Sequence, residues 1–410
     1  MVSAVFPPEP VVSSQLSQQI VHALIERGHE VSVITDFPNR PAGKLFPGYR
    51  RKLFLRERGE DNYDIVRCFS FLSPHSHVFS RFLENFSFGM TSGLAVLMNP
   101  KPDVVYANTW PIFACGLTSL ACKIRNVPIV FNVKDMYPES LVVQGQLKRG
   151  QLIYKLLLWI DKWIASQASA LIVLSNFFAE GYIQLRLTPP SKVHVIPDWE
   201  DSSSMTVLSK DDYRQEANIS RKAFVIVYGG NVGRAAGVET VIQALSTVNV
   251  KREIVFIVAG SGSQLAACQK LAAEVTNIRI LFHSPWASEE TSKVLAAADV
   301  LLLPTQGKQS LASVPSKLLS YLLAARPVLA CVLPESDTAQ VIEKAGCGWI
   351  VPPDNPNLIS NKIEELTSLP KDLLEKMGAA GREFILQNFT SETCLPKMIE
   401  IIENAAQVSV

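Results

Sequence analysis

The chain has 410 residues and carries 39 Lys and Arg against 38 Asp and Glu, so its net charge is close to zero. This balance argues against nucleic acid as a partner, because non-specific nucleic-acid binding needs a surplus of basic residues. The length predicts two domains, and a hydrophobic fraction of 48% argues against disorder. The seven cysteines form no CxxC pair and no Cys/His cluster, which predicts reduced thiols and no zinc site.

The sequence contains no run of about 18 uninterrupted apolar residues, the length that a membrane span needs. The nearest run, 152–174, is interrupted by Lys155, Asp161, Lys162 and Gln167. The N-terminus has neither the basic flank nor the apolar stretch of a signal peptide. We therefore expect a cytoplasmic protein.

Short apolar runs alternate with helical patterns through the first half of the chain. The segment before Pro7 leaves room for only a short strand, and a helix is expected over 14–27, ending at Gly28 as helices commonly do. Five later runs are rich in β-branched residues and predict strands over 30–35, 103–108, 128–133, 170–175 and 192–196. Such alternation predicts a parallel sheet with helices on both faces.

A polar segment, 197–224, has the composition of an interdomain connection, and the alternation then restarts. Six further strands are expected over 224–230, 253–260, 278–282, 299–304, 327–332 and 348–352. We therefore predict an α/β protein with two doubly wound, Rossmann-like domains that face each other across a cleft. Their expected bounds are 1–200 and 201–385, with a C-terminal helix over 386–410 that packs back on the first domain. Ligands of such sheets bind beyond the carboxyl ends of the strands.

The run 313–330, SVPSKLLSYLLAARPVLA, is typical of a polar loop followed by a short helix and a buried strand. Pro315 and Ser316 suit a helix start, and Lys317 and Ser320 share its polar face. A helix N-terminus that carries a cation beside hydroxyl groups attracts phosphate. The alternative interpretation is a buried amphipathic helix whose lysine is merely solvated.

The segment YGGNVGRAAGVET is typical of a strand, a glycine-rich turn and a helix. Gly229, Gly230 and Gly233 let the backbone approach a ligand, and the guanidinium of Arg234 could bind a phosphate through two hydrogen bonds. The segment fits neither a dinucleotide-binding fingerprint nor a Walker loop, and a merely tight connection is the alternative. Residues 259–265 repeat the pattern one unit later, where a tight connection is the favoured interpretation.

Polar residues also follow the expected strands of the first half. Lys134 and Asp135 come directly after 128–133, so both are expected to face the cleft; the alternative is a capping Asp beside a solvated Lys. Further candidate ligand contacts are Asn108, Trp110, Ser13 and Ser14. For the two serines, helix capping alone is the favoured interpretation. No DxD triplet occurs, so the usual means of presenting a divalent metal to a nucleotide diphosphate is missing.

Taken together and in order, these segments resemble the retaining glycosyltransferases of family 4, which have the GT-B fold, and within them the branch that makes bacterial surface and capsular polysaccharides. The resemblance spans nearly the whole chain and rests on FPPEP, ERGHEVSVIT, PDVVYANTWP, VKDMYPESL, ALIVLSNFF, KVHVIPDW, YGGNVG, GVETVIQA, AADVLLLP, SVPSKLLSYLLAARPVLA and GWIVPPDN. Each motif alone is weak, whereas the ordered set is specific.

The resemblance implies transfer of a sugar from a UDP- or GDP-linked donor to a glycan or lipid-linked acceptor, without a cofactor or a metal. The donor would bind mostly to the second domain, through Gly229, Gly230, Asn231, Gly233, Arg234, Ser313, Pro315, Ser316 and Ser320. The acceptor would bind mostly to the first domain, through Ser13, Ser14, Asn108 and Trp110. Asp135 and Lys134 would meet the acceptor or the transferred sugar, with Lys317 as the third candidate catalytic residue.

The chain departs from the family at four positions. Relatives place an Arg and a Lys on the diphosphate where this chain has Asn231 and Ala236, so Arg234 and Lys317 are the candidates for compensating charge. Relatives also place two glutamates at the positions of Ala312 and Ser320, the second of which holds the ribose hydroxyls. Ribose must therefore be held in another way.

Two other functions stay open on the sequence alone: a nucleotide-sugar epimerase of the same fold, and a catalytically silent subunit that binds a sugar nucleotide. Membrane contact is a further open point. The segment 146–167 interleaves Lys148, Arg149, Lys155 and Lys162 with Leu, Ile and Trp, as an interfacial helix on the inner face of a membrane would. A core helix with basic edges is the favoured alternative.

Overall fold

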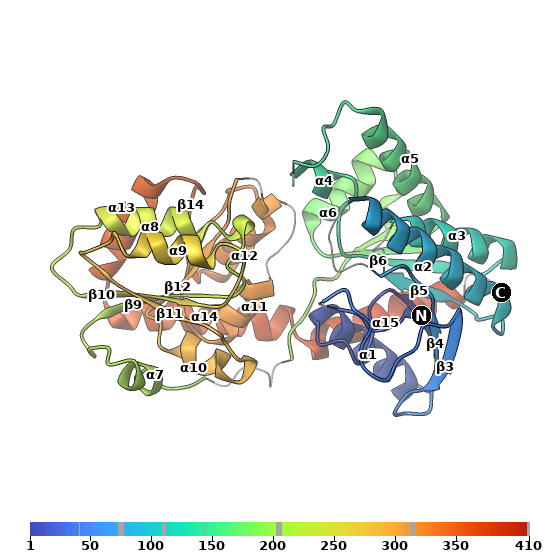
Figure 1. The fold of residues 1–410 in the computed structure, drawn as a ribbon, viewed down its shortest axis with the longest axis horizontal. Coiled ribbons are helices and arrows are strands. Elements are labelled where there is room, and N and C mark those ends of the chain that lie inside the picture. The colour runs from blue at the N-terminus through green and yellow to red at the C-terminus, as the bar shows by residue number, and fades with distance from the viewer. Residues whose placement is uncertain are drawn as a thin grey trace. The chain divides into compact units, whose positions relative to one another are not determined.

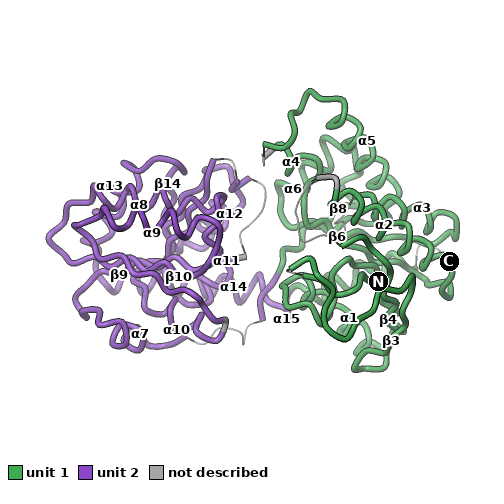
Figure 2. The backbone as a smooth tube through the Cα atoms, viewed as in Figure 1, with its two compact units in different colours: residues 1–198, 394–410 green, residues 199–393 purple. Residues whose placement is uncertain are grey.

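The computed structural model describes residues 1–40, 42–72, 78–108, 112–143, 145–201, 207–307, 309–311 and 316–407. The chain divides into two compact units, shown in Figure 2. Unit 1 comprises 1–198 and 394–410, and unit 2 comprises 199–393. Each unit is built around one sheet with helices on both faces (Figure 1), which confirms the predicted α/β class.

The described part of unit 1 forms an eight-stranded sheet in the order β3-β4-β2-β1-β5-β6-β7-β8. Its strands are β1 (Val2–Ser3), β2 (Ser32–Asp36), β3 (Phe54–Arg58), β4 (Asp64–Cys68), β5 (Val105–Asn108), β6 (Ile129–Val133), β7 (Ala170–Val173) and β8 (Val193–Val195). β3 pairs antiparallel with β4, and the other ladders are parallel. The sequence predicted the parallel strands except β4, and missed β3. Neither of these two strands follows the expected pattern of a continuous apolar run, because charged residues interrupt both.

Most helices of unit 1 connect its parallel strands, as a parallel sheet requires. They are α1 (Val12–Glu26), α2 (Val78–Met98), α3 (Ile112–Arg125), α4 (Glu139–Val143), α5 (Leu152–Gln167) and α6 (Asn176–Glu180), with shorter turns η1 (Gly181–Leu185) and η2 (Pro190–Lys192). Figure 1 shows α2, α3 and α5 over one face of the sheet and α1 with α15 (Ser391–Gln407) over the other. The inner side of α15 buries Met398, Ile399 and Ile402, and its Glu403 bonds Arg27 and His29 just after α1.

The described part of unit 2 forms a six-stranded parallel sheet in the order β11-β10-β9-β12-β13-β14. Its strands are β9 (Phe224–Gly229), β10 (Ile254–Ala259), β11 (Arg279–His283), β12 (Val300–Pro304), β13 (Val328–Cys331) and β14 (Gly348–Val351). Its helices are α7 (Asp211–Glu216), α8 (Val238–Thr247), α9 (Leu265–Ala272), α10 (Thr291–Ala296), α11 (Ser316–Leu323), α12 (Asp337–Ala345), α13 (Pro356–Thr367) and α14 (Lys371–Asn388), with turns η3 (Arg234–Ala236), η4 (Ser288–Glu290) and η5 (Gln309–Leu311). All six strands lie where the sequence predicted them.

Alternate residues of β9 enter two separate cores, because successive side chains of a strand point to opposite faces. Val225 and Val227 pack with α10 and α11, whereas Ile226 and Tyr228 pack with α8 and α13. Tyr228 therefore stands on one face of the sheet while α11 lies on the other. A side chain that joins them has to cross the carboxyl end of β9.

The polar segment 197–224 is not a linker throughout, which corrects its interpretation as an interdomain connection. Within it, α7 packs on unit 2: Arg214 donates to the Ala297 carbonyl at 2.8 Å and to the Asp299 carboxylate at 3.0 Å. Asp299 also accepts the backbone N–H of Val225 at 2.9 Å. These bonds anchor α7 to the first residues of β9 and β12. The polar residues of this segment therefore include a buried arginine that pairs with Asp299, and they do not form an extended connection throughout.

Candidate functional site

Two glycine turns meet at the carboxyl edge of the unit 2 sheet. The first follows β9 and the second follows β10, and they are joined by hydrogen bonds from Val232 N to Ser261 O and from Gln264 N to Val232 O, both 2.9 Å. A Cβ on Gly260 would lie 1.9 Å from the Gly230 carbonyl oxygen, and Gly230 and Gly260 have φ of 140° and 144°. Only glycine fits at these contacts. The turn at 259–265 therefore lies directly against the turn that the sequence singled out.

Lys317 crosses this edge from α11 to reach Tyr228. Its Nζ donates to the Tyr228 hydroxyl at 2.6 Å, and that hydroxyl donates to the Asn231 carbonyl at 2.6 Å. A Cβ on Gly230 would lie 2.2 Å from Lys317 Cε, so the lysine stem passes over a glycine that cannot be replaced without moving it. Burial lowers the pKa of Lys317 to about 8. Within the described residues, no carboxylate forms an ion pair with this ammonium group.

The helix that carries Lys317 is fixed to the same turn. Tyr321, one turn further along α11, accepts the Gly229 N–H at 2.8 Å and donates to the Gly229 carbonyl at 3.0 Å. The leucines of α11 are buried: Leu318, Leu319, Leu322 and Leu323. The position of Lys317 is thus set by packing below it and by Tyr321 beside it.

Ser320 occupies the position at which the family resemblance implied a glutamate. Its hydroxyl lies 3.5 Å from Glu200 Oε1, so a carboxylate from the start of unit 2 stands beside this position. Glu200 is held by a bond from its N–H to the Phe389 carbonyl at 3.1 Å. The sequence analysis missed Glu200, because a residue 120 positions away cannot be related to α11 by spacing.

Arg234 is exposed in η3 and lines an open hollow of about 310 Å³ at the same edge. The other lining residues are Glu239, Thr240, Gln264 and Gln306. Asn231 is exposed beside it, and a Cβ on Gly233 would lie 3.1 Å from the Asn231 side chain. The predicted donor residues Gly229, Gly230, Asn231, Gly233 and Arg234 are therefore brought together with Lys317. The predicted residues Ser313 and Pro315 lie outside the described part of the chain, and Ser316 is the first residue of α11.

At the carboxyl edge of unit 1, Lys134 and Asp135 follow β6 as predicted but point to different partners. Lys134 forms an ion pair with Asp198. Asp135 is hydrogen-bonded to the Ser140 hydroxyl and the Met136 N–H, and burial raises its pKa to about 6. It also lines a small interior cavity of about 10 Å³ with Asp161. These contacts favour the capping interpretation of Asp135, and its role in catalysis remains a prediction.

The predicted acceptor residues differ in their surroundings. Asn108 donates to Ser3 Oγ at 3.0 Å and to Ser17 Oγ at 3.3 Å. Ser13 is exposed, whereas Ser14 is buried and its hydroxyl has no hydrogen-bond partner among the described residues. Neither serine caps α1, because this helix begins at Val12 and its N-cap residue is Val11, which has no capping side chain, so the capping interpretation was wrong. Trp110 lies outside the described residues.

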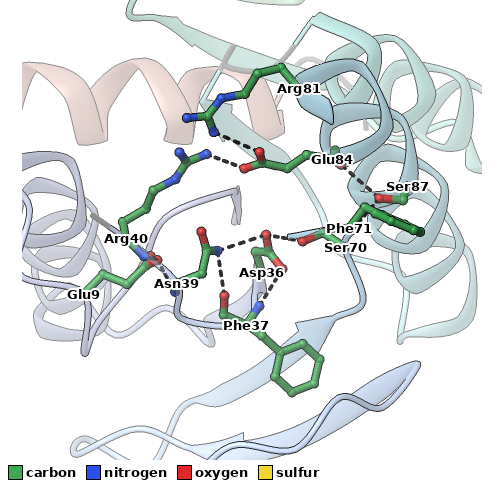
Figure 3. A network of polar contacts seen from close by, with 10 residues as sticks. All are labelled: Glu9, Asp36, Phe37, Asn39, Arg40, Ser70, Phe71, Arg81, Glu84 and Ser87. Carbon is green, nitrogen blue, oxygen red and sulfur yellow. Dashed lines mark hydrogen bonds and ion pairs between the residues drawn. The ribbon is translucent and has the colours of Figure 1, made fainter. Parts of the chain in front are cut away.

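A network of buried carboxylates ties together the loops at this edge of unit 1, as Figure 3 shows. Asp36, at the end of β2, accepts the Ser70 hydroxyl at 2.5 Å and the Phe37 N–H at 2.7 Å. Glu9 accepts the backbone N–H groups of Asn39 at 2.8 Å and of Arg40 at 2.7 Å. The loops after β1, β2 and β4 are thereby joined. This network could not be predicted from the sequence, because its members belong to segments that lie far apart in the chain.

Two family models match the chain, one in each half. Residues 14–199 match the "Glycosyl transferase 4-like domain" and residues 209–384 match "Glycosyl transferases group 1". The chain is a GT-B glycosyltransferase. The resemblance to glycosyltransferases with the GT-B fold is thereby confirmed.

The curated relatives of this glycosyltransferase include one that is named for bacterial polysaccharide synthesis. The glycosyltransferase WbjE of Pseudomonas aeruginosa is 28% identical over 300 residues, which cover 72% of this chain and 73% of WbjE. WcaI of Escherichia coli K12, named for colanic acid biosynthesis, is 20% identical over 405 residues and 97% of both chains.

Solved structures share the fold of this glycosyltransferase along its whole length. Sucrose-phosphate synthase from Thermosynechococcus elongatus has a TM-score of 0.74 at 15% identity and covers 99% of both chains. HepE of Anabaena in complex with UDP-glucose has a TM-score of 0.66 at 14% identity, covering 98% of this chain and 99% of HepE.

None of the helices described here is long and apolar enough to cross a bilayer, and the described residues offer no cluster of three metal-ligating side chains.

Burial of Asp36 gives the first prediction. Because burial raises the pKa of this carboxyl to about 8, from 3.8 in an exposed setting, the folded state holds a proton that the unfolded state releases. The stability from this proton is complete below about pH 4 and is lost as the pH rises through about 8. The free energy of unfolding of the unmodified protein should therefore fall by several kcal/mol between these pH limits, and that of Asp36→Asn should not.

The measurement is urea unfolding of both proteins across that pH range. Asp64→Asn is the matched control, since Asp64 is exposed at the start of β4. An unchanged pH dependence in Asp36→Asn would show that Asp36 is ionised in the folded protein.

Proposed function

We propose that this enzyme transfers a sugar from a nucleotide-sugar donor to a glycan or lipid-linked acceptor with retention of configuration and without a metal ion. The observation that carries the proposal is the Lys317 ammonium. It is partly buried, its hydrogen bond goes to a neutral phenol, and no carboxylate among the described residues pairs with it. A buried cation is costly unless an anion balances it. The diphosphate of the donor would supply that anion.

The glycine turns support the same placement of the diphosphate. Their backbone approaches the edge where Lys317 and Arg234 stand, and peptide N–H groups in such turns bind anionic oxygens. Arg234 and Lys317 would supply the charge that relatives take from the positions of Asn231 and Ala236. The hollow lined by Arg234 and Gln264 would receive another part of the donor. A UDP-linked donor is consistent with the UDP-glucose complex of the similar HepE, and a GDP-linked donor is the alternative.

Retention follows from a same-face displacement. The bond between the sugar C1 and the phosphate oxygen breaks, the acceptor oxygen bonds to C1 from the same side, and the acceptor proton passes to the departing phosphate. The protein then contributes orientation and stabilisation of the leaving diphosphate. Lys317, Arg234 and the turn amides have that role, while Lys134 and Asp135 remain the proposed contacts to the acceptor or the transferred sugar.

We further propose that Glu200 replaces the ribose-binding glutamate that the family places at Ser320. Its carboxylate stands 3.5 Å from the Ser320 hydroxyl, and a carboxylate accepts hydrogen bonds from two neighbouring ribose hydroxyls. A short residue at 320 leaves space for this substitution.

Helix α5 supports a peripheral contact with a membrane, which a lipid-linked acceptor would require. Its exposed positions include Leu152, Ile153, Leu156 and Trp159, with Lys155 and Lys162 among them. An interfacial helix combines large apolar side chains with basic residues in this way.

Replacing the lysine tests the proposed diphosphate contact. Lys317→Ala should lower turnover by on the order of 10²-fold, the cost of losing one preorganised charge contact. In the unmodified enzyme, kcat/KM should fall as the pH rises through about 8, because Lys317 then loses its proton, and Lys317→Ala should lack this fall.

Release of nucleoside diphosphate with and without acceptor measures both effects, after a thermal-shift screen has identified the donor. Lys344→Ala, on the exposed end of α12, is the matched control. Unchanged turnover in Lys317→Ala would refute the assignment.

Replacing the glutamate tests the ribose contact. Glu200→Gln should raise the donor KM roughly tenfold and leave kcat nearly unchanged, because a hydrogen bond to a charged group contributes about 1.5–3 kcal/mol to binding. Steady-state kinetics with a 2′-deoxyribose donor should show little further loss in the variant. Glu253→Gln, exposed before β10, is the control. Additive losses from the variant and the deoxy donor would contradict the contact.

A further inference from the structure

Helix α2 of unit 1 has its large apolar side chains on the outside. Every exposed position of α2 whose side chain is described is Phe, Leu or Met: Phe82, Phe86, Met90, Leu94, Leu97 and Met98, each between 37% and 66% exposed. The first four are spaced four residues apart, so they form one stripe along the helix. The rings of Phe82 and Phe86 stack with their centroids 5.8 Å apart.

The inner side of α2 carries polar groups beside the buried core residues Phe88, Ala95 and Val96. Glu84 accepts from Arg40 and from Arg81, and the Ser87 hydroxyl accepts the Phe71 N–H at 2.8 Å, as Figure 3 shows. The Thr91 hydroxyl donates to the Phe69 carbonyl at 2.7 Å. These groups satisfy the network at the carboxyl edge of the sheet, so the helix cannot rotate its apolar stripe inward without breaking it.

Two glycines on α2 let α3 approach closely. A Cβ on Gly89 would lie 2.8 Å from Ala114 Cα, and one on Gly93 would lie 3.3 Å from the Leu117 carbonyl oxygen. Small residues four apart at a helix interface are common where helices pack in lipid. A helix of a water-soluble domain normally exposes polar side chains opposite the apolar stripe that faces its core, and the described exposed positions of α2 carry none.

The neighbouring helices extend the apolar surface. α3 exposes Leu120 and Ile124, and α5 exposes the apolar residues already named. Figure 1 shows α2, α3 and α5 in one layer over the same face of the unit 1 sheet, and Phe82 meets Phe113 of α3 edge to face at 5.1 Å. Scattered exposed apolar residues are normal, but a surface that continues over three adjacent helices marks an interaction site.

Exposed charge on this layer is of one sign. In the described parts of α2, α3, α5 and the segment 145–151, the basic residues are Arg81, Lys123, Arg125, Lys148, Arg149, Lys155 and Lys162. The acidic residues of the same segments, Glu84 and Asp161, are buried and paired with arginines. A second copy of this surface would bring like charges together, whereas an anionic lipid surface complements them.

We propose that α2, with the outer faces of α3 and α5, is a docking surface for an anionic membrane, with the α2 stripe seated in the interface between headgroups and acyl chains. This extends the contact proposed for α5 to a helix for which the sequence predicted no membrane role. It does not depend on the identity of the donor. An amphipathic surface of this kind binds through buried apolar area together with attraction to anionic headgroups.

Flotation of the full chain with vesicles of phosphatidylcholine, with and without phosphatidylglycerol, tests the proposal. The chain should float with the anionic vesicles and do so less at high salt. The variant Phe86→Ser/Met90→Gln/Leu94→Gln should partition at least about tenfold more weakly, since each substitution removes a large apolar side chain from the interface. The matched control is Leu358→Gln/Leu373→Gln, which changes exposed leucines of unit 2.

A second measurement does not depend on the triple variant folding. The cysteines at 68, 115, 122, 268, 331, 347 and 394 are all buried, so Met90→Cys and, as a control, Leu358→Cys can each be labelled with an environment-sensitive fluorophore. The label at 90 should move to a more apolar environment on addition of anionic vesicles, and the label at 358 should not.

Three results would overturn the proposal. The first is that the α2 variant floats as the unmodified chain does, whereas a Leu156→Gln/Trp159→Ser variant no longer floats. Only the α5 contact would then stand. The second is concentration-dependent self-association that the α2 variant removes, without vesicle binding. The third is binding to native membranes but not to pure lipid. Transfer to a water-soluble acceptor should persist in the α2 variant, so this test is separate from that of glycosyl transfer.

Discussion

The placement of one ammonium group governs the carboxyl edge of unit 2. Lys317 reaches Tyr228 only because Gly230 has no side chain, and the second glycine turn can sit beside the first only because Gly260 has none. Tyr321 and the buried leucines of α11 hold the lysine in position from the other face of the sheet. The cost of burying a cation without a carboxylate is therefore built into the packing, and the hydroxyl and ring of Tyr228 offset part of it.

The sequence predicted those features of the fold that repeat. Continuous apolar strands and the helices between them were recognisable because a parallel sheet buries both of its faces. β3 and β4 escaped notice because charged residues interrupt both apolar runs, FLRER and DIVRC. Arg67 of β4 is nevertheless buried, because it bonds the Glu57 carboxylate and the Pro7 carbonyl. The glycine turn after β9 was recognisable in the sequence because only glycine tolerates its backbone conformation and its close contacts.

The parts of the site that the sequence could not predict depend on contacts between distant segments. Tyr228 belongs to the segment YGGNVGRAAGVET, but it contacts Lys317 only because the lysine side chain crosses the carboxyl end of β9. Glu200 meets Ser320 across 120 residues, and Asp36 meets Ser70 across 34. Spacing along the chain gives no information on such pairs. The serine at 320 predicted that ribose would be held by a residue elsewhere in the chain. Only the fold shows that the Glu200 carboxylate stands beside this position.

The outward stripe of α2 and the buried carboxylates of unit 1 are two consequences of one arrangement. Glu84 and Ser87 face inward because the loops after β2 and β4 need polar partners, and that orientation places Phe82 and Phe86 outside. Periodicity gives the spacing of an apolar stripe but not the direction in which it faces, so the sequence alone would assign this stripe to the core. In water the exposed stripe contributes nothing to stability, and in contact with lipid it gains the transfer free energy of several large side chains. The polar network that fixes the loops at the carboxyl edge thus also fixes the surface that would bring those loops to a lipid-linked acceptor.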